Sequence, residues 1–199
     1  MKIRPLTVEG AWEVTPAQHS DSRGTFLEWY RFDALAEAVG RPLELAQANL
    51  SVSARDVVRG IHFADVPPGQ AKYVTCVAGE VLDVVVDVRV GSPTFGRWES
   101  VRLDDDERRA VYLAEGLGHA LCALSEQATV AYLCSSTYRP GHEHGIDPLD
   151  PELGIVWPAA APLLSTKDAA APSLAEARAA GLLPRYDECS AFAESARRP

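Results

Sequence analysis

The most constraining stretch of this chain covers residues 81–90, in which apolar and charged side chains alternate. Each even-numbered position from 82 to 88 is leucine or valine, whereas Asp83, Asp87 and Arg89 stand at odd positions. Because successive side chains of a β-strand point to opposite faces of its sheet, this alternation predicts a strand. We expect it to have one apolar and one polar face, and the rest of the fold to be built around it.

Other short stretches of strand character follow one another along most of the chain, separated by turns that contain glycine or proline. The expected strands cover residues 11–14, 25–30, 44–52, 57–63, 72–78, 98–103, 110–113, 120–124 and 129–138, with polar turns at 19–24 and 104–109. Many short strands at this spacing are typical of an antiparallel sandwich or barrel. The sequence therefore predicts a mainly β fold.

Helical signals are few and lie mostly near the C-terminus. Residues 32–39 have helical spacing and stop before Gly40, a residue type favoured just after the end of a helix. Ser173 and Glu176 stand at the spacing of a capping box, and the next glycine would end that helix. We expect residues 187–198 to be weakly helical and exposed.

Composition limits both the number of domains and the kinds of partner. A chain of 199 residues, 47% of them hydrophobic, is long enough for one domain with a substantial core. Its formal net charge of −9 argues against nucleic acid or an anionic membrane as a partner, although a pocket can still be locally positive. The first ten residues hold no apolar stretch typical of a signal peptide, and no run approaches the ~18 residues of a membrane span.

The four cysteines stand at positions 76, 122, 134 and 189 and form no Cys-x-x-Cys pair, so no zinc-ribbon or redox signature is present. Three of them lie in apolar runs, where buried free thiols are common. A reducing cytoplasm is therefore the expected location.

Candidate functional side chains gather just before the central strand. Arg59, His62 and Lys72 flank a Pro-Pro-Gly loop at residues 67–69, and they offer a base and two cations to a small anion. Each residue alone also has a plain structural explanation. His62 is equally compatible with a core histidine bonded to a carbonyl, and Lys72 with an edge residue whose stem covers apolar surface.

Two further candidates lie outside this stretch. Tyr132 shares a strand face with Tyr138, which is usual for an aromatic core residue. Asp168 follows Lys167 in a segment typical of a solvated turn. We expect no metal, because no His-x-His followed by Glu surrounds His62.

Taken in order, these residues resemble the dTDP-4-dehydrorhamnose 3,5-epimerase family, and more closely its relatives in antibiotic deoxysugar pathways. The resemblance covers residues 9–168. It rests on Asp21, Arg23, Gly24, Phe26 and Glu28, on Gln47, Asn49, Ser51 and Ser53, on residues 59–62, on Gln70 and Lys72, on residues 79–89 and 92–96, and on Tyr132, Tyr138, Glu143, Asp150, Pro151, Trp157, Pro158, Leu164, Ser165, Lys167 and Asp168. Each piece is weak alone, but the set in this order is specific.

The resemblance implies a cupin-type jelly roll, that is, an antiparallel β-sandwich or barrel with a few short helices. It implies one domain over residues 1–199, with a core at 9–168 and a helical C-terminal segment at 169–199. It further implies a homodimer without metal or cofactor, acting on a small-molecule dTDP-4-keto-6-deoxyhexose. The implied reaction inverts carbon 3, carbon 5 or both by removal and return of a proton.

The resemblance also implies a role for each matching residue. His62 would be the general base, Tyr132 the general acid and Asp168 the partner of His62. Lys72 is suited to stabilise the enolate that forms beside the carbon-4 ketone. The residues implied to line the substrate site are Arg23, Glu28, Gln47, Asn49, Arg59, His119, Tyr138, Glu143 and Lys167.

Two departures from the common family pattern leave open which carbon reacts. Leu117 and Leu121 stand on either side of His119 where the family commonly has phenylalanine, and Ala64 replaces a glutamine. These changes alter the apolar wall of the implied site without removing its ionisable groups.

Two other classes of protein are alternatives to an epimerase. One is a metal-dependent cupin isomerase or dioxygenase, and the other is a non-catalytic cupin that binds a nucleotide sugar. The presence of both His62 and Tyr132 favours the epimerase, because binding alone needs no acid–base pair.

Overall fold

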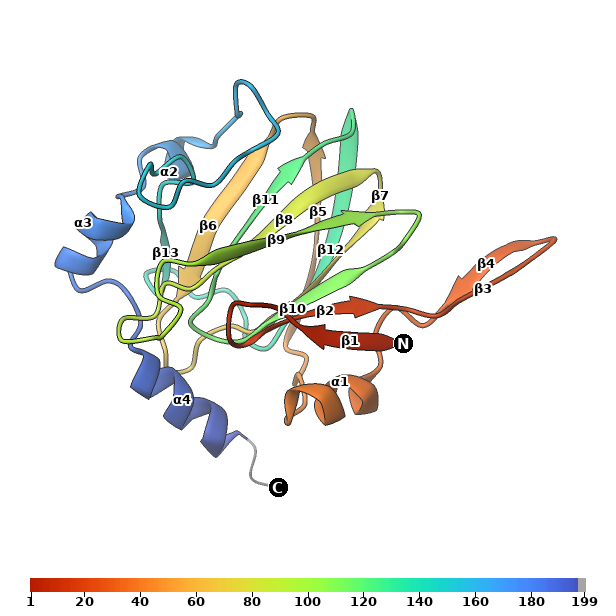
Figure 1. Ribbon diagram of the computed structural model, residues 1–199, viewed down its shortest axis with the longest axis horizontal. Helices are drawn as coiled ribbons and strands as arrows, with labels where there is room; N and C mark the ends of the chain where they lie inside the picture. The colour runs from red at the N-terminus through yellow and green to blue at the C-terminus, as the bar shows by residue number, and fades with distance from the viewer. Residues whose placement is uncertain (197–199) are drawn as a thin grey trace.

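The protein is described here by a computed structural model that covers residues 1–196, and it consists mainly of two antiparallel sheets that face each other (Figure 1). The six-stranded sheet comprises, in spatial order, β1 (Lys2–Pro5), β2 (Ala11–Thr15), β10 (Ala110–Leu113), β7 (Lys72–Ala78), β12 (Gln127–Cys134) and β5 (Gln47–Ala54). The five-stranded sheet comprises β13 (Glu143–Gly145), β6 (Val58–Ala64), β11 (Gly118–Ala123), β8 (Glu80–Val86) and β9 (Trp98–Asp104). This architecture confirms the predicted mainly β, cupin-type jelly roll.

The main hydrophobic core fills the space between the two sheets. Val85 and Leu121 enter it from the five-stranded sheet, and Val74, Val111 and Val130 enter it from the six-stranded sheet. All five side chains are almost completely buried. Burial of one such side chain is worth about 1.5–3 kcal/mol relative to exposure, so the facing sheets supply much of the stability of the fold.

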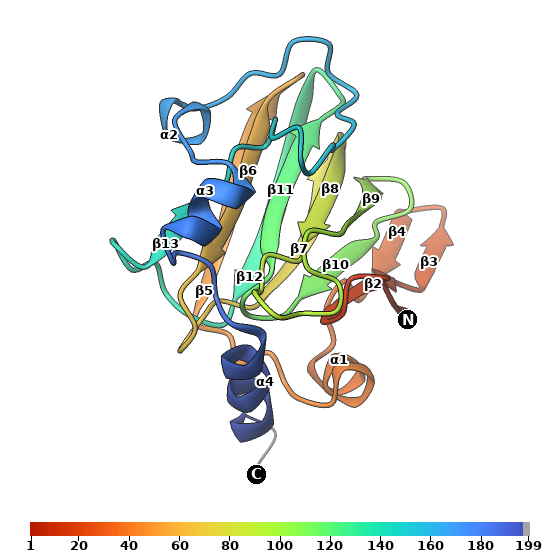
Figure 2. The same ribbon diagram turned by 60° about the vertical axis from the view of Figure 1, so that its left-hand side comes forward.

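Helices cover the outer faces of both sheets. α1 (Phe32–Val39) packs Leu35 against the outside of the six-stranded sheet. α3 (Leu174–Ala179) buries Leu174 against the outside of the five-stranded sheet, and it lies in front of β6 in Figure 2. The space between the sheets is therefore left to the strands and their loops.

The two helix signals that include a capping residue are confirmed. α1 ends at Gly40, whose left-handed φ of 82° suits glycine, and the Gly40 amide donates to the carbonyl of Ala36. At the start of α3, the amide of Glu176 donates to the Ser173 hydroxyl, and the Glu176 carboxylate accepts from the Ser173 amide. This reciprocal arrangement is the expected capping box.

The central strand is shorter than its sequence pattern predicts, and its polar face is buried. β8 ends at Val86, because the chain then bends into a turn in which Asp87 accepts hydrogen bonds from Arg89, Ser92 and Thr94. Asp83, Asp87 and Arg89 are 1%, 0% and 5% exposed. The charged face therefore meets partners inside the protein and not water.

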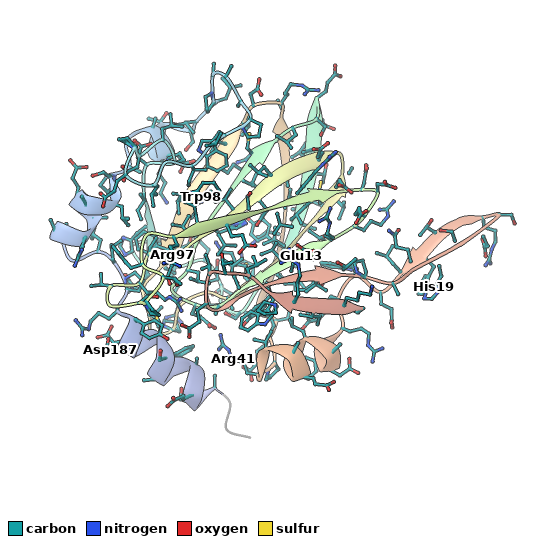
Figure 3. The ribbon with its side chains drawn as sticks, in the orientation of Figure 1. Glu13, His19, Arg41, Arg97, Trp98 and Asp187 are labelled. Atoms are coloured by element: carbon teal, nitrogen blue, oxygen red, sulfur yellow. The ribbon has the colours of Figure 1, made fainter. Side chains whose placement is uncertain are left out.

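The expected turn at residues 19–24 is wrong in extent. β3 (Gln18–Asp21) and β4 (Gly24–Leu27) form a hairpin with only two residues in its loop, and Asp21 pairs with Gly24. The hairpin extends away from the body of the protein in Figure 1, and His19, which it carries, lies far from the other labelled side chains in Figure 3. Within the described residues, β3 and β4 form a sheet of their own and pair with no strand of the two large sheets.

Besides β3, two strands and part of a helix were not anticipated. β1 pairs with β2 of the same chain, and the short strand β13 pairs with β6 in a stretch for which no strand was expected. α4 (Tyr186–Ser195) begins before the expected segment, and it buries Cys189 instead of being wholly exposed. The helix was expected to continue to residue 198, but residues 197 and 198 lie outside the described part of the chain. Within residues 1–196, no helix is long and apolar enough to span a membrane.

Candidate active site

His62 and Asp168 form a close pair although 106 positions separate them in the sequence. β6 supplies His62, and the short helix α2 (Thr166–Ala169) supplies Asp168 after the capping residue Ser165. The His62 Nε2 atom lies 2.6 Å from Asp168 Oδ1. Asp168 is 5% exposed, so the expectation of a solvated turn is wrong: the turn is folded back against β6.

The environment of Asp168 favours its charged form. Burial alone would raise the pKa of this carboxyl, but the hydrogen bond and charge of His62, together with the Ser165 hydroxyl, lower it below the ordinary value. A charged aspartate that accepts a hydrogen bond from Nε2 of a histidine orients the ring and leaves Nδ1 as the proton acceptor. The pair is therefore suited to a ring that accepts a proton during a reaction.

The facing sheet brings a cation and a phenol to the same space. In the β7–β12 pair, Lys72 lies opposite Cys134, and Tyr132 lies opposite Val74. Because residues two apart on a strand share a face, Lys72, Cys134 and Tyr132 all point to the interior. Tyr132 packs against the main core, as its strand pattern predicts.

Burial changes the acidity of both groups. Shielding from water lowers the pKa of Lys72, while the nearby Cys134, Glu143 and Asp83 oppose the shift. Shielding raises the pKa of Tyr132, which keeps its proton available near neutral pH. The site therefore holds a cation of increased acidity next to a protonated phenol.

A cavity of about 390 Å³ opens beside His62 at the edge of the five-stranded sheet. Arg59, Glu143, Lys167 and Asp168 also line it, so the structure brings together five of the residues singled out in the sequence. The Arg59 Nε atom donates to the Ser53 hydroxyl at 2.9 Å, which ties β6 to β5. Two cations, a carboxylate and the histidine–aspartate pair thus share one opening.

Polar side chains of β5 continue the site on the six-stranded sheet. Gln47 lies opposite Cys134 and Asn49 opposite Tyr132, so the amides are placed next to the phenol. The Gln47 Nε2 atom donates to Asn49 Oδ1 at 2.9 Å. Gln47 Oε1 accepts from the amide of Tyr138, whose exposed ring lies beyond the end of β12 at the rim.

A second histidine–aspartate pair lies deeper in the site. His119 pairs with His62 across the β6–β11 ladder, and its Nε2 atom lies 2.7 Å from Asp83 Oδ2. Within the described residues the other oxygen, Asp83 Oδ1, has no hydrogen-bond partner. Asp83 was not among the site residues predicted from the sequence. The sequence does contain a signal for the burial of Asp83. Its side chain lies on the same strand face as the apolar Val81 and Val85, two residues away on either side, so a carboxylate stands on a buried face.

Two expected site residues lie elsewhere. Arg23 is at the tip of the β3–β4 hairpin, where its guanidinium pairs with Asp21 and its side chain is 87% exposed. Glu28 follows the hairpin and lies 3.7 Å from Arg31. Neither residue contributes to the opening beside His62 within this chain.

Other candidate sites in the described residues do not rival this one. A larger cavity of about 590 Å³ lies between α4 and β2, but none of the expected site residues lines it. Within residues 1–196, no group of three or more histidine, cysteine, aspartate or glutamate side chains is arranged to hold a metal ion. The chemistry-bearing residues therefore concentrate at His62.

A histidine–aspartate pair that faces a lysine and a phenol across a jelly roll defines an acid–base site of the kind that moves protons at carbons next to a carbonyl. The chain belongs to the dTDP-4-dehydrorhamnose 3,5-epimerase family, whose model matches residues 5–176. Membership confirms the resemblance found in the sequence and makes the protein an isomerase.

Its relatives include enzymes from antibiotic producers. A dTDP-4-dehydrorhamnose 3-epimerase of Streptomyces niveus is 67% identical over 191 residues, which cover 96% of this chain and 92% of the relative. NovW, a 4-keto-6-deoxy sugar epimerase from the novobiocin gene cluster of Streptomyces spheroides, has a TM-score of 0.94 at 67% identity over 95% of each chain. ChmJ, a 3'-monoepimerase of Streptomyces bikiniensis solved with dTDP-quinovose, has a TM-score of 0.94 at 52% identity, over 97% of this chain and 98% of its own.

Proposed function

We propose that this enzyme inverts carbon 3 of a dTDP-4-keto-6-deoxyhexose during the biosynthesis of a deoxysugar for an antibiotic. The observation that carries the proposal is the His62–Asp168 pair, at 2.6 Å, in which His62 lies on the sheet opposite Lys72 and Tyr132. A base on one wall and a proton donor on the other can act on opposite faces of a sugar ring held between them. That arrangement is what inversion of a carbon centre requires.

The reaction follows from the chemistry of the ketone. The carbonyl at carbon 4 acidifies the proton on carbon 3, and His62 Nδ1, the ring nitrogen that does not face Asp168, accepts this proton as the C–H bond breaks. The electron pair moves onto the carbonyl oxygen, and the Lys72 ammonium stabilises the resulting enolate. The Tyr132 phenol then donates its proton to the opposite face of carbon 3, and solvent exchange restores both side chains.

The proposed substrate binds through charges at the opening. Arg59 and Lys167 line the same cavity as His62 and are suited to the diphosphate, because guanidinium and ammonium groups are common phosphate ligands. Gln47, Asn49 and Glu143 would bind hydroxyls of the sugar or groups of the nucleoside.

Carbon 3 is proposed as the reacting centre because the Streptomyces niveus relative and ChmJ both bear names of 3-epimerases.

A homodimer is part of the proposal. β5 is an edge strand whose outer face exposes Leu50 and Val52, 64% and 48% respectively, and the β3–β4 hairpin exposes Phe26 by 69%. Apolar side chains on an unpaired edge favour contact with another chain. A hairpin that reaches out from one subunit can carry Arg23 to the site of its neighbour, which would account for the distance of Arg23 from His62.

The four free cysteines fit the proposed cytoplasmic location.

The proposal is tested by the position at which solvent deuterium enters the substrate. The enzyme is incubated in heavy water with dTDP-4-keto-6-deoxyglucose, and NMR then locates the label. We expect deuterium at carbon 3 of the epimerised product. Label at carbon 5 as well would extend the activity to both carbons, whereas unlabelled and unchanged sugar would reject an epimerase in favour of a binding protein.

A further inference from the structure

Asp65 lies just after β6 and holds two histidines of the neighbouring chain segment. His142 Nδ1 lies 3.1 Å from Asp65 Oδ2, and His144 Nε2 lies 2.7 Å from Asp65 Oδ1. The backbone adds a hydrogen bond, because the Asp65 amide donates to the carbonyl of His142 at 3.0 Å. One carboxylate thus bridges two side chains that stand on either side of Glu143, and we call these three residues the Asp65 clasp.

His144 of the clasp lies on the face of the sheet that points away from the catalytic residues. β13 pairs antiparallel with β6, so that His144 lies opposite Phe63 and Glu143 lies opposite Ala64. The His144 ring also packs on the Phe63 ring, with centroids 5.5 Å apart. Because side chains alternate along a strand, His144 points outward when Glu143 points into the site.

Glu143 is the member of β13 that meets the chemistry. It lines the cavity beside His62 together with Arg59. Its charge also opposes the lowering of the pKa of Lys72 and contributes to the raised pKa of Tyr132, the cation and the proton donor of the opposite sheet. Glu143 therefore lies where a carboxylate can accept a hydrogen bond from a hydroxyl of the bound sugar.

The strand that carries Glu143 is anchored just after its C-terminal end by Ile146, which is buried and exchanges two backbone hydrogen bonds with Ile61, whereas its N-terminal end is held by the Asp65 clasp. β13 is three residues long and lies at the edge of its sheet, with β6 as its single neighbour. Short edge segments open easily, and a small displacement of a binding group costs much affinity. Contacts on the outer face that fix β13 would fix Glu143 as well.

We propose that Asp65 is a positioning residue, whose bridge to His142 and His144 holds β13 so that Glu143 binds the sugar. This inference rests on the proposed function, because it takes Glu143 to be a substrate ligand. The clasp acts through the strand backbone and has no contact with the reacting atoms. Its loss should therefore weaken substrate binding and leave the proton transfers intact.

The test is a double-mutant cycle on the full chain with Asp65→Ala and Glu143→Gln. We expect Glu143→Gln to raise KM about 10-fold and Asp65→Ala to raise it about 3- to 10-fold, with kcat of Asp65→Ala within about twofold of the wild type. The double variant should have a KM within about twofold of Glu143→Gln alone, because both changes remove the same contact. Asp187→Ala is the matched control, since it removes an exposed carboxylate from its pair with Arg185 and should leave KM unchanged.

Several outcomes would overturn the inference. A loss of kcat at constant KM in Asp65→Ala would indicate a purely structural role. If the KM increases of the two single variants multiplied in the double variant, Asp65 and Glu143 would act independently on substrate binding. An unchanged KM in Glu143→Gln would also reject it, while deuterium at carbon 3 would still support the proposed function. If Asp65→Ala does not fold, His144→Phe removes one arm of the clasp but keeps ring packing on Phe63, and it must raise KM in the same way.

Discussion

His62 and His119 lie directly opposite each other on β6 and β11, and each ring binds a different aspartate. The side chain of His62 is 35% exposed, whereas that of His119 is 11% exposed and faces the buried Asp83. A general base must reach a proton on the substrate, so the more open ring is the better candidate. His119 is suited instead to a fixed hydrogen bond within the site.

Lys72 should set the alkaline limit of the reaction. Shielding from water lowers the pKa of its ammonium, so the charge that stabilises the enolate is lost at a lower pH than for an exposed lysine. Lys72→Arg, although less active, should remain charged and lack this decline. Profiles of kcat/KM from about pH 7 to about pH 11 measure the difference. Identical alkaline limbs in the two proteins would show that another group sets the limit.

Asp168 should contribute stability that depends on pH. Its pKa is lowered in the folded protein, so the contribution is complete above the unfolded value, about 3.9, and is lost as pH falls through the lower folded value. The difference in free energy of unfolding between the wild type and Asp168→Asn should therefore shrink under acid conditions. Urea unfolding at neutral and at acid pH provides the comparison. A difference that is constant over this range would reject the electrostatic contribution.

The β3–β4 hairpin should complement the site of a second subunit. Arg23→Ala and His62→Asn homodimers should each be strongly impaired. Mixed dimers would contain one site with both native residues, so an equimolar mixture after subunit exchange should recover about a quarter of the wild-type sites. Activity before and after mixing measures this recovery. No recovery in mixtures that form heterodimers would mean that Arg23 does not act across the interface.

Tyr132 should be needed for inversion more than for proton removal. Phenylalanine keeps nearly all of the apolar volume that packs on the core, so Tyr132→Phe should fold. It should exchange the carbon-3 proton with solvent while retaining configuration, faster than it forms epimerised product. NMR of the substrate in heavy water separates the two rates. Equal loss of exchange and inversion in a folded variant would count against the phenol as the acid.

Strand positions could be predicted from the sequence because alternation is a local property of each strand. The ends of the strands could not be predicted in this way. β8, for example, ends at Val86 because Asp87 accepts hydrogen bonds from side chains of the following turn. β13 was missed because it is short and polar, and its support comes from Asp65, nearly eighty positions earlier. Local patterns contain no information about such distant contacts.

The same limit applies to the site. His62, Lys72 and Tyr132 could be singled out because their residue types suit acid–base chemistry, and the family pattern supplied their companions. The residues around Asp168 predict a solvated turn, because the burial of this carboxylate depends on contact with β6 and not on its sequence neighbours. The alternation around Asp83 is compatible with a buried carboxylate, but its pairing with His119 on another strand has no local signal in the sequence.

The measurement that tests the central claim most directly is solvent exchange at carbon 3 in His62→Asn, with His119→Asn as its matched comparison. Asparagine keeps a polar side chain beside Asp168, so folding should be preserved and only the base is lost. Since a positioned general base contributes ~10²–10⁴-fold, we predict at least a ~100-fold loss of deuterium incorporation in His62→Asn. His119→Asn should retain slower but measurable exchange. Near-normal exchange in a folded His62→Asn protein, with exchange abolished in His119→Asn, would contradict the assignment of His62 as the base.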